Sequence, residues 1–434
     1  MQTLVQLING ELKGSRSLKI SEGLTDFPRA VFELADTLEY LDLSSNKLSR
    51  LPHDFGRLRK LKIFFASENL FTSLPEVLAD CPDLDLVGFK SNQIDFIPPN
   101  ALNKNLRWLI LTNNRLTTLP KEIGNCLRMQ KLMLSGNRLT TLPVELSGCK
   151  NLTLLRIAAN SLNSLPDWLI AMPALSWIAF SGNSFANVRQ QRVVPLLDFR
   201  SFEVNEKLGE GASGVIYKAK DISGKIAEEV AIKIFKGSVT SDGFPGDEIS
   251  AYIEAGNHDG LVRLIGKIEL PERKETGLVM KLIPEGYSNL GLPPSFASCT
   301  RDVFEENIEL SIHKLVKVAL TIASVSEQLH SKGIIHGDLY AHNILINNDG
   351  DTLFGDFGAA SFYDKSISSA RIIERIEVRA FGYLLDDLLS ITTSDQNSEE
   401  QYVIKSIRDS CLSPEIDDRP DFAEITYRLK ALVN

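Results

Sequence analysis

Three polar side chains around a short turn, those of Asp338, Asn343 and Asp356, are the residues of this chain best suited to chemistry. Two short apolar runs, 344–346 and 352–354, flank the turn sequence N-N-D-G-D, which predicts a tight hairpin. The hairpin would bring Asn343 and Asp356 close together. Carboxylate and amide oxygens can hold metal ions, and a carboxylate can orient a hydroxyl group toward a phosphate.

A glycine-rich stretch upstream has the spacing G-x-G-x-x-G, with glycines at Gly209, Gly211 and Gly214. Glycines let a backbone approach phosphates closely and offer them N–H groups. Dinucleotide-binding folds share this spacing, so the motif alone is not specific. Those folds continue into a helix, whereas residues 215–219 continue as a strand-like run, which favours a phosphate loop between two strands.

A lysine and a glutamate follow this loop in an order that suits an ion pair. Lys233 ends the β-rich run V-A-I-K, and Glu248 opens a segment with apolar residues at helical spacing. Glu254 is the rival partner, but it lies nearer the end of the predicted helix. Asp247 and Glu248 could also be ordinary acids of a helix N-terminus, where the dipole favours negative charge.

These segments together resemble the protein kinase domain, and the resemblance runs from Phe202 to the end of the chain. It implies that Asp338 orients the substrate hydroxyl and accepts its proton, and that Asn343 and Asp356 hold Mg²⁺ ions. It also implies an ion pair of Lys233 with Glu248 and a cofactor site for ATP. The nucleotide-binding residues implied are Leu208, Gly209, Glu210, Gly211, Ala212, Ser213, Gly214, Val215, Ile216, Lys233 and Met280.

Longer elements must hold these residues in place. Residues 277–283 read as a buried strand that leads to a hinge, with Met280 in the gatekeeper place. Residues 311–332 read as a helix with one apolar face, and Gly333 ends it. The C-terminal segment resembles the kinase segment that carries a structural arginine, here Arg419.

The N-terminal half is a repeat array. The pattern L-E-Y-L-D-L-S-S-N-K-L starts at Leu38 and restarts every 22 or 23 residues, to give seven copies. It resembles the leucine-rich repeat, in which one short strand per unit stacks its leucines on the next unit. Each copy carries an asparagine that we expect to satisfy backbone groups at the turn after the strand: Asn46, Asn69, Asn92, Asn114, Asn137, Asn160 and Asn183.

Three cysteines, Cys81, Cys126 and Cys149, occupy one shared position of the repeat. Repetition at one position indicates small buried groups rather than metal ligands or a disulfide framework. A less complete unit from Leu18 would cap the start of the array.

The outward positions of the predicted repeat strands form an apolar stripe. The third and fifth residues of each unit point away from the core. A contiguous exposed apolar patch usually marks an interface, so we expect the stripe to bind a protein partner or the chain's own second domain. The alternative is that some of these side chains fold back into neighbouring packing. The stripe comprises Ile63, Phe65, Leu86, Trp108, Ile110, Met133, Leu154 and Trp177.

The predicted architecture has two domains: an α/β leucine-rich-repeat solenoid, then an α+β bilobal protein-kinase-like domain. The repeats occupy 1–187, a linker 188–199 that is partly helical up to Pro195, and the kinase domain 200–434. A net charge of −9 argues against a nucleic-acid partner. No secretory signal pattern and no apolar run of membrane-spanning length occurs, so the expected setting is the cytoplasm, with export into another cell left open.

The kinase-like part departs from its family in three ways. Gly337 replaces the arginine of H-R-D, which normally receives an activation-loop phosphate, so a phosphorylation latch is not expected. Tyr340 stands where serine/threonine kinases have a lysine, and His342 is a candidate substitute for that charge or a plain loop residue. The segment between Asp356 and Glu377 is short and lacks A-P-E. Its serines are candidate autophosphorylation sites or polar linker residues: Ser361, Ser366, Ser368 and Ser369.

The functional prediction is an ATP-dependent protein kinase that acts on Ser or Thr in preference to Tyr. Together the two halves resemble bacterial leucine-rich-repeat protein kinases. The form H-G-D-L-x-x-x-N also resembles aminoglycoside and choline kinases, which phosphorylate small molecules. A non-catalytic kinase-like scaffold is the third hypothesis, and the presence of the lysine, glutamate, asparagine and both aspartates argues against it.

Overall fold

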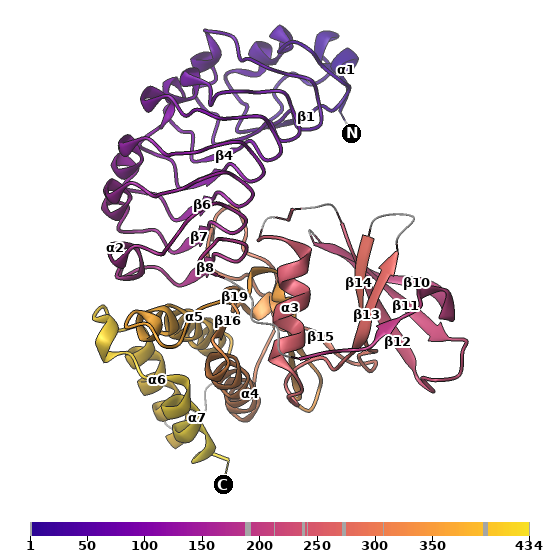
Figure 1. Ribbon diagram of the computed structural model, residues 1–434. Helices are drawn as coiled ribbons and strands as arrows, with labels where there is room; N and C mark the ends of the chain where they lie inside the picture. Colours follow the sequence, from indigo (N-terminus) through magenta and orange to yellow (C-terminus); the bar gives the residue numbers. More distant parts are fainter. Residues whose placement is uncertain are drawn as a thin grey trace. The chain divides into compact units, whose positions relative to one another are not determined.

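The computed structural model describes residues 2–186, 192–211, 213–236, 239–240, 242–270, 275–306, 308–393 and 398–433 (Figure 1). The chain divides into two compact units, Met1–Leu175 and Ser176–Asn434. This division falls before residue 187, the predicted end of the repeat domain, because Trp177 and its neighbours pack within the second unit.

The first unit is a stack of parallel three-residue strands, one for each repeat, with helical turns along one side of the stack (Figure 1). The strands are β1 (Ser17–Lys19), β2 (Tyr40–Asp42), β3 (Ile63–Phe65), β4 (Leu86–Gly88), β5 (Trp108–Ile110), β6 (Lys131–Met133) and β7 (Leu154–Arg156). The helical segments are α1 (Leu4–Ile8), η1 (Arg29–Leu34), η2 (Phe55–Arg57), η3 (Glu76–Asp80), η4 (Pro99–Ala101), η5 (Lys121–Asn125), η6 (Val144–Gly148) and α2 (Asp167–Ile170).

The repeat strands begin at the third residue of each predicted copy, as the sequence period requires. Their middle side chains, such as Leu41, Phe64 and Leu109, are fully buried. A three-residue strand cannot bury that side chain alone, so each repeat depends on its neighbours for a core.

The repeated asparagines join successive repeats by hydrogen bonds. The Asn137 side-chain oxygen Oδ1 accepts a hydrogen bond from the Leu116 backbone N–H at 3.0 Å. Its amide donates to the carbonyl oxygens of Leu111, at 2.9 Å, and Leu134, at 2.8 Å. The structural role predicted for these asparagines is confirmed.

The repeated cysteines are buried packing groups, as predicted. Burial raises the pKa of the Cys81 and Cys126 thiols to about 12 and that of the Cys149 thiol to about 11. These thiols therefore stay protonated at neutral pH. Among the described residues, no cluster of His, Cys, Asp or Glu is arranged to hold a metal ion.

The apolar stripe is only partly exposed. Leu86 and Leu154 are buried, which corrects the expectation that they face solvent. The Phe65 ring lies over Gly88, where an added Cβ would be 2.5 Å from the ring. The Lys131 ammonium lies 4.3 Å from the centre of the Trp108 ring. Part of the stripe is thus covered by its own neighbours, the alternative raised by the sequence.

The second unit contains a mixed sheet in the order β10-β11-β12-β14-β13-β9. Its strands are β9 (Leu196–Leu197), β10 (Phe202–Glu210), β11 (Gly214–Asp221), β12 (Glu229–Phe235), β13 (Leu264–Leu270) and β14 (Glu275–Lys281). The described part of the predicted linker helix, residues 192–195, is irregular, and after it Leu196 and Leu197 pair in parallel with β13. Residues 188–191 of that predicted linker lie outside the described residues.

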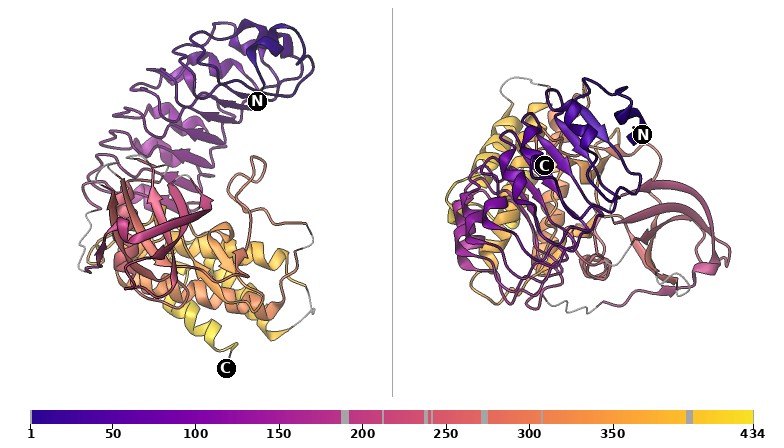
Figure 2. Two further views of the ribbon diagram at one scale, coloured as in Figure 1. Left: turned by 90° about the vertical axis from the view of Figure 1, so that its right-hand side faces the viewer. Right: turned by 90° about the horizontal axis from the view of Figure 1, so that it is seen from above.

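Helices α4 (Ile312–Ser331), α5 (Ala370–Ser390), α6 (Glu399–Cys411) and α7 (Phe422–Lys430) gather apart from this sheet (Figure 2). Helix α3 (Pro245–Ala255) packs beside β14. Ser311 caps α4 through the Lys314 N–H, and Gly333 follows with φ +69°, as the sequence predicts. Among the described helices, none combines the length and apolar character needed to cross a bilayer.

The second unit also contains short strands outside this sheet. They are β8 (Trp177–Ala179), β15 (Ser288–Asn289), β16 (Ile334–Ile335), β17 (Ile344–Ile346), β18 (Thr352–Phe354) and β19 (Ser361–Phe362). The pair β17–β18 is the predicted antiparallel hairpin, with Ile344 opposite Phe354. Strand β19 pairs with β16, so the short segment after the hairpin is tied back to the helices.

The hydrogen bonds of the repeated asparagines, called the asparagine ladder below, lead to a testable prediction for stability. Replacing Asn137 by Ala removes three buried hydrogen bonds, and we expect a loss of about 2–4 kcal/mol in the free energy of unfolding. The control is Asn151→Ala, which removes one exposed hydrogen bond to the Leu127 carbonyl. Chemical denaturation measures both, and equal losses would contradict the structural role of the ladder.

Candidate active site

The lysine and glutamate predicted as a pair are in contact. Lys233 on β12 and Glu248 on α3 form a buried ion pair, and the Lys233 ammonium lies 3.6 Å from the Asp356 carboxylate. Burial lowers the pKa of Lys233, but the carboxylates of Asp356 and Glu248 outweigh it and the net pKa is raised. Burial raises the pKa of the Glu248 carboxyl, and the Lys233 ammonium opposes that rise. One lysine therefore joins the sheet, the helix and the hairpin.

The hairpin brings its polar residues to one end. The Asn343 amide donates to the Asp338 carboxylate at 2.8 Å and to the Asp338 carbonyl oxygen at 2.9 Å. The Asn343 carbonyl accepts from the Gly355 N–H at 3.2 Å, directly before Asp356. Asp356 has φ +54° and accepts from the Gly358 N–H. Asp338, Asn343 and Asp356 are thus neighbours, as the sequence predicts.

The segment His336–Asn343, called the catalytic loop below, is anchored from the helical side. The buried Glu377 on α5 accepts from the Gly337 N–H at 2.8 Å and contacts His330 at 2.7 Å. Burial raises the pKa of the Glu377 carboxyl, but its partners, His330 first, outweigh burial and the net pKa is lowered. The fully buried His336 stacks on Phe354, with ring centres 3.9 Å apart.

Two departures from the kinase pattern, Gly337 and Tyr340, have structural causes. Gly337 has φ +74°, and an added Cβ would lie 2.6 Å from the Ile178 carbonyl oxygen and 2.7 Å from that of Ala359. An arginine therefore has no room there. Tyr340 is buried and stacks on Trp177 at 4.4 Å with an angle of 8° between the rings. Trp177 thus faces the catalytic loop, not solvent.

His342 has a partner that the sequence did not indicate. Its Nδ1 lies 2.7 Å from a carboxylate oxygen of Asp302, whose side chain is buried. A neighbouring carboxylate favours the protonated imidazole. Asp302 lies in a long loop without a motif, so no sequence signal could have identified it.

A cleft of about 530 Å³ lies beside these groups, and it is lined by most of the residues predicted to bind nucleotide. Lining residues from that prediction are Leu208, Gly209, Gly211, Ser213, Gly214, Ile216, Lys233 and Met280. Glu248, His342, Asn343 and Asp356 also line it. Sequence reasoning missed Ala231, Tyr252, Val262, Leu278, Lys281, Leu282, Ile283, Pro284, Tyr287, Asn289, Leu345 and Gly355. Ala231 carried a signal, since it precedes Ile232 and Lys233 in V-A-I-K.

Two of the predicted nucleotide-binding residues, Glu210 and Val215, do not line the cleft. Glu210 forms ion pairs with Lys207 and Lys236 and is absent from the described lining of the cleft. Val215 pairs with Ile234 across the sheet and is likewise absent from it. Ala212 lies outside the described residues.

The glycines of the loop serve different needs. An added Cβ at Gly209 or Gly211 would meet nothing within 4 Å, so these two leave the cleft open to a ligand. At Gly214 it would lie 2.4 Å from the Ile234 carbonyl oxygen, so this glycine is required by the pairing of β11 with β12.

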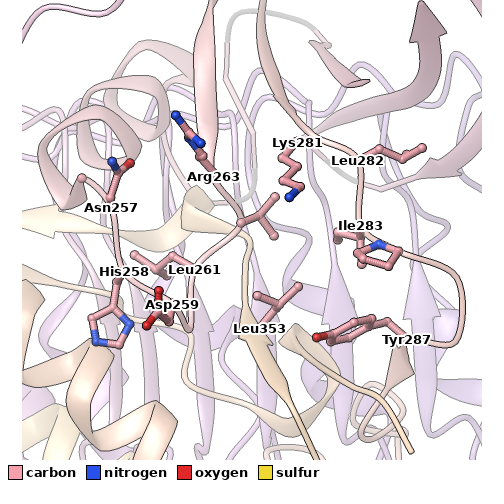
Figure 3. A pocket seen from close by; sticks show the side chains of 13 residues that line it. Asn257, His258, Asp259, Leu261, Arg263, Lys281, Leu282, Ile283, Tyr287 and Leu353 are labelled. Carbon is pink, nitrogen blue, oxygen red and sulfur yellow. The ribbon is translucent and has the colours of Figure 1, made fainter. Parts of the chain in front are cut away.

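A second cavity of about 530 Å³ shares Lys281 and Tyr287 with the first, and Figure 3 shows Arg263, Lys281 and Tyr287 among its side chains. It lacks Lys233, Asn343 and Asp356 among its lining residues. Size therefore does not separate the two cavities. The first is the candidate active site because the ion pair and two side chains predicted to hold metal, Asn343 and Asp356, line it.

The anchored loop gives a pH-dependent prediction. A carboxyl group whose pKa is lowered by folding stabilises the protein above its unfolded pKa, near 4.5, and loses that contribution as the pH falls through the lower folded value. Glu377→Gln lacks this titration, so the Tm difference between wild type and variant should shrink as the pH falls below 4.5. Calorimetry from pH 7 to 3 tests it, and a constant difference would contradict the prediction.

Comparison with known proteins agrees with this geometry. The family model of the protein kinase domain matches residues 202–384, and leucine-rich-repeat models match 37–58, 104–162 and 127–185. The chain is 25% identical to cyclin-dependent kinase 12 of Caenorhabditis elegans over 52% of this chain and 34% of that protein. It is 29% identical to the mouse megakaryocyte-associated tyrosine-protein kinase over 41% and 31% of the two chains.

The name of a third relative contains both a leucine-rich repeat and a protein kinase. The chain is 30% identical to a probable leucine-rich-repeat receptor-like serine/threonine-protein kinase of Arabidopsis thaliana, over 46% of this chain and 20% of that protein. The chain spans about a third or less of the length of these three relatives. The matched models and the described site agree with each other on where the kinase domain lies. The chain therefore carries leucine-rich repeats and, after them, a protein kinase domain.

Proposed function

We propose that this chain is an ATP-dependent protein kinase that transfers the γ-phosphate to Ser or Thr hydroxyls in preference to Tyr. The observation that carries the proposal is the connected set of Lys233, Glu248 and Asp356 at one side of the cleft, with Asn343 bonded to Asp338 at the other. Among the named relatives, the receptor-like serine/threonine-protein kinase supports the preferred acceptor. Cyclin-dependent kinase 12 and the tyrosine kinase support the protein-kinase class alone.

The side chains suit the transfer of a phosphoryl group. Lys233 would bind the α- and β-phosphates of ATP, and Asn343 and Asp356 would supply oxygens that suit Mg²⁺. Bound Mg²⁺ would neutralise phosphate charge. Asp338, oriented by the Asn343 amide, would align the acceptor hydroxyl and take its proton. The hydroxyl oxygen bonds to the γ-phosphorus, and the bond to the β–γ bridging oxygen breaks to release ADP.

His342 takes part in this proposal as a cation. Tyr340 is buried against Trp177, so it offers no charge to a phosphate in place of the usual lysine. His342 lines the cleft, and the Asp302 carboxylate favours its protonated form. A protonated imidazole at this point would stabilise charge on the γ-phosphate.

The repeat array adds a protein-binding surface to the proposal. Ile63, Phe65, Trp108, Ile110 and Met133 stay partly exposed on β3, β5 and β6. We assign this surface to a protein partner, since partly exposed aromatic and aliphatic groups on one face favour such contacts. The repeat cysteines are not in disulfides, which fits a reducing cytoplasm.

The transfer reaction is tested with the full chain, labelled ATP and Mg²⁺. Asp338→Asn keeps the shape but removes the proton acceptor, so transfer to protein should fall about a hundredfold or more. The control, Asp349→Asn, changes an exposed aspartate in the turn of the same hairpin and should leave the rate unchanged. Labelled aminoglycoside or choline without labelled protein would instead indicate a small-molecule kinase. Absence of any transfer would favour a scaffold.

The proposed role of His342 has its own test. His342→Gln preserves size but cannot carry the charge, so the rate should fall and its dependence on pH between 6 and 8 should flatten. Initial rates at saturating ATP measure this. If turnover from pH 6 to 8 is the same in wild type and variant, His342 is a loop residue without a phosphate contact.

A further inference from the structure

A short segment of the seventh repeat belongs by its contacts to the kinase-containing unit. Residues 176–183, called the clamp segment below, include β8 and the turn after it. Its side chains Trp177, Ile178 and Phe180 are buried within the assembled chain. The kinase family model begins only at residue 202, so this segment is no part of the kinase pattern itself.

The clamp segment contacts the catalytic loop through Trp177. The indole stacks on Tyr340 and also on Tyr383 of α5, at 5.5 Å and 20°. Its Nε1–H donates to the Leu339 carbonyl oxygen at 3.0 Å. Leu339 directly follows Asp338, so this hydrogen bond fixes the backbone next to the proposed proton acceptor.

A second contact reaches the segment after Asp356. The Ser361 hydroxyl oxygen accepts from the backbone N–H groups of Phe180, at 2.9 Å, and Ser181, at 3.1 Å. Two buried donors share one acceptor, and both would be left unsatisfied without it. The clamp segment thus fixes the position of β19. In protein kinases, the activation loop that phosphorylation usually orders begins in this strand.

A third contact reaches the start of α3, the helix of Glu248. Gly182 has φ +69°, and an added Cβ would lie 2.7 Å from the Phe244 ring and 3.0 Å from an Asp247 carboxylate oxygen. The backbone at Gly182 therefore lies directly against the helix N-terminus. Burial raises the pKa of Asp247 to about 6 despite the Ser181 hydroxyl beside it.

We propose that the clamp segment positions the catalytic centre, in place of a phosphorylated activation loop. This rests on the proposed kinase function. Three parts must be aligned for phosphoryl transfer: the catalytic loop, the segment after Asp356 and the helix that carries Glu248. The clamp segment contacts all three through Trp177, Phe180, Ser181 and Gly182. Trp177 is the central positioning residue, since its indole alone makes both stacking contacts and the hydrogen bond to Leu339.

The kinetic test uses the full chain with Trp177→Ala and the control Trp168→Ala, which truncates a partly exposed tryptophan on α2. We expect kcat to fall about tenfold or more in Trp177→Ala, because the loop beside Asp338 loses its fixed position. The Kd for Mg-ADP, measured by calorimetry, should stay within about twofold, since the cleft residues are unchanged. Trp177→Phe keeps a stacking ring and should recover part of kcat. An unchanged kcat in Trp177→Ala overturns the proposal.

Hydrogen exchange provides a readout that does not depend on activity. Amides of residues 337–343 and 359–363 should exchange faster in Trp177→Ala than in wild type, and not in Trp168→Ala. Ser361→Ala is the milder second variant if Trp177→Ala fails to fold, and it should show the same local change. Unchanged exchange in the variants overturns the clamp. If wild-type protein transfers no phosphate, the kinase proposal fails, and exchange alone still decides whether the segment holds the loop.

Discussion

The backbone at Gly337 is confined on all sides, and the arrangement of the catalytic centre depends on this constraint. The buried Glu377 carboxylate holds its N–H, while carbonyl oxygens of Ile178 and Ala359 occupy the space that a side chain would need. Its φ of +74° is a conformation that glycine adopts at little cost. The loss of the usual arginine is therefore required by close backbone packing, and it is not a neutral change of sequence.

That packing connects two features that otherwise look unrelated. Tyr340 replaces a lysine, and Trp177 ends an apolar stripe of the repeats, yet the two rings stack on each other. A strand of the repeat array thus supplies a stacking contact at the position where serine/threonine kinases have a charged lysine. On the other side of the cleft, Lys233 ties the sheet to α3 and to the hairpin. Buried contacts therefore hold the centre at both ends.

Much of this could be predicted from sequence because it depends on local patterns. The repeat period predicted one short strand for each unit, and turn chemistry predicted the hairpin that joins Asn343 to the segment of Asp356. The ion pair of Lys233 and Glu248 followed from motif order. Contacts between distant segments carried no such signal. Two examples are the contact of Asp302 with His342 and that of Ser361 with Phe180. Both depend on how loops fold back onto distant segments, which the spacing of residues in the sequence does not encode.

The errors have the same physical origin. Leu86 and Leu154 sit at outward strand positions, but alternation along a strand says nothing of what covers that face. Residues 196 and 197 follow Pro195 in the predicted linker and pair with β13 as an edge strand, a tertiary contact for which the local sequence carries no signal.

The central claim is that this kinase centre is held in its working arrangement by its own repeat segment. The most direct measurement is the initial rate of phosphate transfer from labelled ATP by the full chain after complete dephosphorylation. The account predicts immediate transfer without a lag and at the rate of the untreated protein. A dephosphorylated chain that is inactive, and gains activity only as serines of residues 361–369 become phosphorylated, would contradict it.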